Sequence, residues 1–183
     1  MTRPPADLDA PIGELVRELV AQIGEDGVVD ACIDLLGGAD RGEYLDVLPY
    51  LTGHSFAPGA VALDPVRWRP YWVRTWGARG LLHVWHERAA AQVLAGLADE
   101  HWRPAEMCLR VAARREIGGA GDQAARLTTH ALPRVRAQAL RALAVVGDTE
   151  HVECVRDRLD DPDPEVRRRA ALALERLAER LDL

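Results

Sequence analysis

Apolar residues recur through the second half of the chain at the spacing of an amphipathic helix. Between residues 134 and 146, the positions Val135, Ala139, Ala142 and Val146 share one face at about 100° per residue. The pattern repeats with a period of about 31 residues, which aligns this helix with three other segments. These segments are 72–83, 103–114 and 165–176. Each is therefore predicted to be a helix that buries one face.

Three shorter helices are predicted between these, at 86–98, 121–130 and 149–160. Turn residues separate the two sets: Gly118 and Gly119 follow one long helix and Gly147 follows another. The sequence Asp-Pro-Asp-Pro at 161–164 forces a further break, because proline cannot continue a helix interior. The predicted unit is a helix, a short turn and a second helix, repeated along the chain.

The N-terminal part follows this pattern less closely. Helices are predicted there at 11–23, 26–37 and 41–52, and residues 53–67 are expected to form a degenerate or partly irregular helix. Terminal units of a repeat array are often atypical, because the end unit must present a face to water. We therefore expect a single all-α domain over 1–183, with atypical helices at 10–64 and regular repeats at 65–183.

The repeated unit resembles a known family in two segments. These are LDDPDPEVRRRAALALERLAE (159–179) and HALPRVRAQALRALAVVGD (130–148), each with a turn, a Val-Arg pair and a stripe of small residues. This unit resembles HEAT repeats of the short type also found in the phycobilisome-lyase group. The resemblance implies an armadillo-like α-solenoid with a right-handed superhelix and no sheet. It also implies that the second helix of each unit lines a concave surface.

Charge is distributed unevenly along the chain. The net charge of −6 argues against nucleic acid or an anionic membrane as the obvious partner. The second helices nevertheless sum to +9, whereas the first helices with their turns sum to −7. All 23 basic side chains are arginine, so an arginine at one position carries little information by itself and its place in the repeat must carry the argument.

The repeat register predicts which side chains face a partner. Arg79, Arg110 and Arg141 form one column on the side of the helices opposite the apolar stripe. Neighbouring columns complete a predicted partner-binding face, whose members are Trp72, Trp76, Arg79, His83, Arg103, Arg110, Arg114, Arg134, Gln138 and Arg141. In the alternative interpretation these charges only keep a solenoid soluble, and Trp72 and Trp76 pack against residues 53–67.

The arginines of the Val-Arg pairs have a different expected role. Arg74, Arg136 and Arg167 are expected to pair with turn aspartates of neighbouring units and so to stabilise the stack.

No catalytic constellation, metal site or cofactor site is predicted. His86 and Glu87 resemble the His-Glu pairs of HEAT-like deoxyhypusine hydroxylases, but the sequence holds one such pair where that iron site uses several. Cys108 aligns with small residues of the packing stripe, which predicts a core role. The three cysteines are far apart and no apolar leader or membrane span is visible, so we expect free thiols and a cytoplasmic location.

These observations favour a non-enzymatic scaffold whose basic, Trp-bearing concave face binds an acidic peptide or protein segment. The first alternative is a nucleic-acid-binding protein with the architecture of HEAT-like DNA glycosylases. Their catalytic carboxylate cannot be carried over, because Glu165 is the only acidic residue in the predicted concave columns. The second alternative is a lyase or chaperone of the phycobilisome-lyase type.

Overall fold

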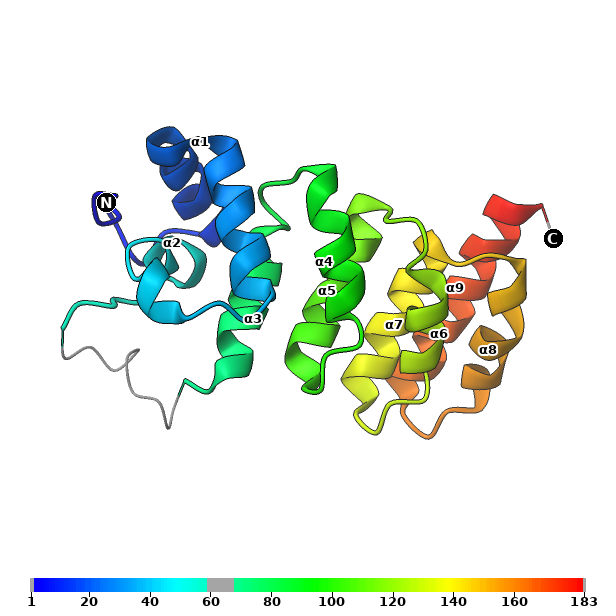
Figure 1. Ribbon diagram of the computed structural model, residues 1–183. Coiled ribbons are helices and arrows are strands. Elements are labelled where there is room, and N and C mark those ends of the chain that lie inside the picture. The colour runs from blue at the N-terminus through cyan, green and yellow to red at the C-terminus, as the bar shows by residue number, and fades with distance from the viewer. Residues whose placement is uncertain (1, 59–67, 183) are drawn as a thin grey trace. The chain divides into compact units, whose positions relative to one another are not determined.

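The computed structural model describes residues 2–58 and 68–182, and every regular element among them is a helix (Figure 1). The all-α prediction is thereby confirmed. Of the irregular segment expected at 53–67, residues 53–58 contain no helix and 59–67 lie outside the described residues. The chain divides into two compact units with the boundary between Gly96 and Leu97. The single-domain organisation and the right-handed superhelix stay predictions.

The first unit is built around one long helix. Its elements are α1 (Ile12–Leu36), η1 (Arg41–Tyr44), α2 (Leu48–Thr52), α3 (Pro70–Gly80), η3 (Glu87–Ala89) and α4 (Ala90–Gly96). Helix α1 is divided by a kink at Gly24, whose φ of 79° and ψ of 163° are not helical, so its two segments agree with the helices predicted at 11–23 and 26–37. The helix predicted at 41–52 differs from the structure, because η1 and the short α2 occupy that stretch.

Helices α1 and α3 pack against each other without room for a side chain at their closest point. A Cβ atom on Gly77 of α3 would lie 2.6 Å from the carbonyl oxygen of Cys32 and 2.6 Å from the backbone nitrogen of Leu36. Both atoms belong to the backbone of α1, so no rotamer change could relieve the clash. Glycine is therefore required at this crossing.

The second unit consists of stacked helix pairs. Its elements are α5 (Trp102–Arg115), α6 (Gly121–Leu127), α7 (Pro133–Val146), η4 (Thr149–His151), α8 (Val152–Arg156), η5 (Asp157–Asp160) and α9 (Pro164–Leu181). Helix α7 packs between α5 and α9, and the shorter elements run alongside (Figure 1). Each long helix of this unit begins one residue before its predicted start. The helix predicted at 149–160 is instead divided among η4, α8 and η5.

The apolar stripe of α7 forms the core of this unit. Val135, Ala139 and Ala142 are fully buried, as the periodicity predicts, and Leu140 and Leu143 are fully buried as well. Little of the α7 surface therefore reaches solvent, because neighbouring helices pack on more than one of its sides.

The repeat period reappears in the hydrogen bonds of the turns. The side chains of Asp99, His130 and Asp161 occupy equivalent positions of three successive repeats. Each accepts a hydrogen bond from the backbone N–H two residues later, at 2.8, 3.0 and 3.0 Å. The same side chain to backbone bond thus precedes α5, α7 and α9, and it fixes the direction in which each long helix starts.

Candidate functional site

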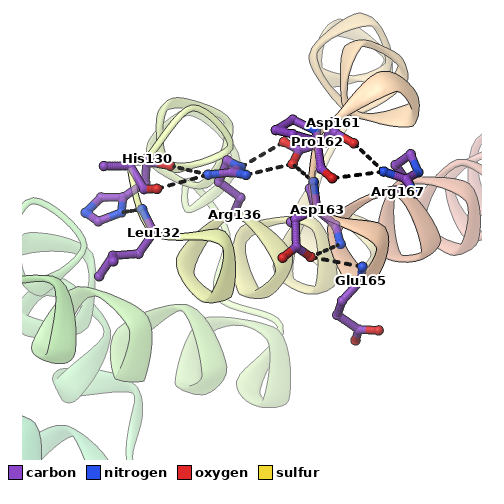
Figure 2. Close-up of polar contacts among 10 residues, drawn as sticks. His130, Leu132, Arg136, Asp161, Pro162, Asp163, Glu165 and Arg167 are labelled. Carbon is purple, nitrogen blue, oxygen red and sulfur yellow. Dashed lines mark hydrogen bonds and ion pairs between the residues drawn. The ribbon is translucent and has the colours of Figure 1, made fainter.

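Arg136 joins two successive helix pairs (Figure 2). Its Nε and Nη2 donate to the two carboxylate oxygens of Asp161 at 2.8 and 2.6 Å, and its Nη1 donates to the carbonyl oxygens of His130 and Ala131. The side chains are only 10% and 2% exposed, and the guanidinium holds the pKa of Asp161 below its ordinary value. The predicted pairing of Arg136 with a turn aspartate is confirmed, so this arginine is structural.

Four residues of the predicted binding face lie in the first unit, and two of them are held by the fold. Trp76 is only 2% exposed and packs edge-on against Phe56, with ring centroids 5.8 Å apart. Arg79 is half-buried and donates from Nη2 to the carbonyl oxygen of Leu51 at 2.7 Å, and burial lowers its pKa. The expectation that Trp76 faces a partner is therefore corrected, and the alternative that Trp76 packs against the segment 53–67 is confirmed by its contact with Phe56. Trp72 is half-buried, whereas His83 is exposed.

In the second unit, two further arginines of the predicted face stack on Trp102. The guanidinium carbons of Arg103 and Arg134 lie 4.4 and 4.7 Å from the ring centroid, within the range of a cation–π interaction. Arg134 also forms an ion pair with Glu106 at 2.8 Å. Both side chains therefore take part in contacts at the start of α5 and α7.

Gln138 is buried, which corrects the expectation that it lies on a binding face. Its Oε1 accepts a hydrogen bond from Nη1 of Arg141 at 3.2 Å. The buried Gln138 therefore helps to position the exposed side chain of Arg141. The helical wheel placed both residues on the same side of α7, but α5 and α9 cover only the shorter side chain.

A groove of about 370 Å³ opens beside Arg141, between α7 and α9. We call it the α7–α9 groove. Its apolar lining residues are Leu140, Ala144, Leu172 and Ala173, and its charged lining residues are Arg141, Arg169, Glu175, Arg176 and Glu179. Leu172 is 45% exposed among these charged residues. The groove therefore offers apolar surface next to several guanidinium groups.

One carboxylate partly neutralises these arginines. Glu165 accepts hydrogen bonds from Arg141, Arg168 and Arg169 at 3.0, 2.8 and 2.7 Å. The bonds from Arg168 and Arg169 lower the pKa of Glu165 to about 2. Partial burial, followed by the positive charge of Arg169, lowers the pKa of Arg141. Because three arginines share one carboxylate, the cluster keeps an excess of positive charge.

Arg110 and Arg114 extend this positive surface along α5. Both are exposed, and neither forms a hydrogen bond or ion pair with any residue in the described part of the second unit. Arg110 is close enough to disfavour the charged form of Arg141. The predicted neighbourhood of Arg110 and Arg141 therefore exists in the structure, although whether it binds a partner stays a prediction.

The family model for HEAT repeats matches residues 122–182. Residues 122–182 are HEAT repeats. They include both the Arg136–Asp161 pair and the α7–α9 groove, and HEAT repeats generally act as protein-interaction scaffolds. The more specific phycobilisome-lyase type stays a prediction.

Similarity to other known proteins is limited. No curated protein matches the HEAT-containing chain. Among solved structures, the crystal structure of an engineered protein is similar, with a TM-score of 0.48 and 16% identity over 91% of this chain and 79% of that chain. None of the described helices is both long and apolar enough to cross a membrane.

One cluster in the HEAT repeats has the composition of a metal site. Ligand atoms of Asp122, Glu150 and His151 lie within 4.8 Å of one another. However, Nδ1 of His151 accepts a hydrogen bond from the backbone N–H of Asp148 at 2.9 Å, so the ring proton of the neutral form lies on Nε2 and faces Asp122. Metal binding through Nε2 would require that proton to leave this position. The cluster is therefore a structural hydrogen-bond network.

The described cysteines are free thiols with different surroundings. Cys32 and Cys108 are fully buried and Cys154 is half-buried. Burial raises the pKa of Cys32 to about 12 and also raises that of Cys108. The full burial of Cys108 confirms the prediction that it is a core residue. A thiol of raised pKa is also a poor nucleophile.

Of the residues that line the α7–α9 groove, the predicted binding face includes only Arg141. Arg169, Leu172 and Arg176 stand one repeat period after Gln138, Arg141 and Val145, so the HEAT register already placed them in the same columns. Their exposure could not be read from one helix, because it depends on how α7 and α9 pack together.

The titration of Glu165 gives a direct test of this charge cluster. Because its pKa in the folded protein is about 2, below the ordinary value of 4.5, its stabilising contribution is present above the unfolded-state pKa and is lost as the pH falls toward 2. Replacing Arg169 by glutamine removes one donor and is expected to raise this pKa. Carbon NMR of the carboxyl group measures it, with Arg176→Gln as the control that leaves it unchanged. A wild-type midpoint near 4.5 would contradict the arrangement.

Proposed function

We propose that the second unit is a non-enzymatic HEAT-repeat interaction module that holds an acidic peptide or protein segment in the α7–α9 groove. The observation that carries this proposal is an exposed leucine, Leu172, that lines the groove together with Arg141, Arg169 and Arg176. Glu165 partly neutralises Arg141 and Arg169, and Glu175 and Glu179 also line the groove. If these arginines served only to keep the protein in solution, an exposed leucine among them would have no purpose. The combination matches a ligand that carries both a carboxylate and an apolar side chain.

The chemistry of binding follows from the groove and from Arg110 of α5, which does not line the groove but lies close enough for its charge to act on Arg141. A carboxylate of the segment would take bidentate hydrogen bonds from the exposed guanidinium of Arg110, where geometry and charge both favour a carboxylate. An apolar side chain next to it would cover Leu172 and Ala144, and burial of apolar surface would add to the affinity. Arg141 would be shared between the ligand and Glu165.

Selection from a library of random peptides tests this proposal without knowledge of the natural partner. On the wild-type protein, we expect enriched sequences to combine acidic residues with a neighbouring leucine or similar side chain. The double variant Arg110→Gln/Arg141→Gln should lose these sequences. Arg126→Gln/Arg156→Gln has the same charge change on exposed arginines of α6 and α8 and should keep them. Enrichment without an acidic bias, or equal enrichment on both double variants, would contradict the proposal.

Nucleic acid is the second candidate ligand, because Arg110 and Arg114 are exposed on one helix and carry no counter-charge in the described second unit. Phosphate binding would make the affinity for duplex DNA fall steeply as salt is raised. Glu175 and Glu179 line the α7–α9 groove and would repel the many charges of a continuous phosphate backbone more strongly than the single carboxylate of a short segment, which favours the acidic segment. A titration of duplex DNA at two salt concentrations separates the two ligands.

A further inference from the structure

The guanidinium of Arg136 has two edges with separate roles (Figure 2). Its Nη1 donates to two carbonyl oxygens of the turn before its own helix, at 2.9 and 3.2 Å. Its other edge, formed by Nε and Nη2, binds the carboxylate of Asp161 in the following helix pair. The first edge fixes the orientation of the arginine, and the second edge joins the two pairs.

Arg167 repeats the first half of this arrangement one repeat period later. Its Nη1 donates to the carbonyl oxygens of Asp161 and Pro162 at 2.8 and 3.1 Å (Figure 2). No described residue supplies a carboxylate or any other hydrogen-bond partner for its Nε and Nη2, and the side chain is exposed. The pairing expected for Arg167 is thus limited to backbone carbonyls. Helix α9 therefore presents a fixed guanidinium, and the equivalent guanidinium on α7, that of Arg136, binds a carboxylate.

The surface beside Arg167 is also less covered than the equivalent surface of the preceding repeat. Leu140 and Leu143 of α7 are fully buried, and α9 packs against this helix. Their equivalents on α9 are Ala171, which is exposed, and Leu174, which is half-buried. Both positions are therefore buried on α7, whereas the equivalent positions on α9 are partly or fully exposed to solvent.

The short helices show the same difference. Thr128, which follows α6, is buried, whereas its equivalent in the next repeat, Leu159 of η5, is 38% exposed. Apolar surface is therefore open to solvent in both helices of the last described pair.

We propose that this outer edge of the last described helix pair, defined by Leu159 of η5 and by Arg167, Ala171 and Leu174 of α9, docks a helix pair of a partner protein. An aspartate in the turn before the partner's second helix would bind Nε and Nη2 of Arg167, as Asp161 binds Arg136. The charge complementarity is specific, because a guanidinium whose other edge is already bonded offers two parallel donors to a carboxylate. This edge is separate from the α7–α9 groove and does not depend on its function.

The partner surface has a defined shape as well. Ala171 stands on α9 where Leu140 stands on α7, so a partner helix must supply a larger side chain there, or approach more closely, to fill the same space. Leu174, which is half-buried, and Leu159, which is 38% exposed, offer further apolar surface. The expected partner therefore has bulky apolar residues beside an aspartate-bearing turn.

The test supplies a helix pair of known sequence. Residues 152–182 are repeated directly after Asp182 of the full chain, so that the copy's counterpart of Asp161 lies one repeat period beyond Asp161. The covalent link provides a high effective concentration. Amide hydrogen exchange is then measured at Ala171 and Leu174 in the natural and the extended chain. We expect these amides to become more protected in the extended chain, and Arg167→Gln to reduce that protection roughly tenfold.

Two control variants make the outcome decisive. Arg167→Gln should leave exchange in the natural chain unchanged, and Arg176→Gln should leave the extended chain unchanged. An appended copy that gives no protection, or an equal effect of Arg167→Gln in both chains, would overturn the proposal. Self-association of the natural chain that Arg167→Gln abolishes, measured by sedimentation, would also overturn it, because a second copy would then cover the edge.

Discussion

Replacing Arg136 by alanine is expected to lower the free energy of unfolding of the second unit by about 3 kcal/mol. The substitution leaves the carboxylate of Asp161 buried without its partner, and it removes the hydrogen bonds to the carbonyl oxygens of His130 and Ala131. Urea denaturation followed by circular dichroism measures the change. Because the pKa of Asp161 is lowered in the folded protein, the contribution of the pair is present above the unfolded-state pKa and is lost as the pH falls.

Arg167→Ala is the matched control for this experiment. Arg167 makes the same two bonds to turn carbonyls, but it is exposed and binds no carboxylate among the described residues. Its loss is expected to cost about 1 kcal/mol or less. Equal losses for Arg136→Ala and Arg167→Ala would show that the link to Asp161 contributes little to stability.

Gly77→Ala is expected to lower the stability of the first unit by about 3 kcal/mol. The added Cβ would lie 2.6 Å from two backbone atoms of α1, at Cys32 and Leu36, so α1 and α3 would have to move apart. Separation of the helices would in turn expose residues packed between them. Thermal unfolding followed by circular dichroism detects the change as a lower Tm.

Gly118→Ala provides the comparison at a glycine with open surroundings. No atom lies within 4 Å of a Cβ built there, and Gly118 is not among the glycines with positive φ. The substitution should leave stability unchanged or raise it by about 0.5 kcal/mol, because alanine loses less conformational entropy on folding. A Tm for Gly77→Ala as high as that for Gly118→Ala would contradict the close packing of α1 and α3.

The long helices of the second unit were predictable because the repeat period of the sequence locates each of them. The repeat period places α5, α7 and α9 within one residue of their observed starts, and the same period appears in the hydrogen bonds of the turns. The first unit lacks this repetition. There, the break at Gly24 was predicted, but the single helix expected at 41–52 is replaced by η1 and the short α2.

The binding face was predictable only in part, because a helical wheel represents one helix alone. It correctly left Arg110 and Arg141 at the surface, since the charged ends of these long side chains reach past neighbouring helices. It failed for Trp76 and Gln138. Burial of Trp76 depends on Phe56, which lies in an irregular segment, and burial of Gln138 depends on the helices packed beside α7.

An acidic segment that binds the arginines of the α7–α9 groove must compete there with Glu165. The most direct measurement is fluorescence anisotropy of one selected acidic peptide, titrated with three proteins. Glu165→Gln removes the internal competitor and should bind the peptide more tightly than the wild type does. Arg110→Gln/Arg141→Gln should bind it roughly tenfold more weakly. Equal affinity for all three proteins would contradict binding in this groove.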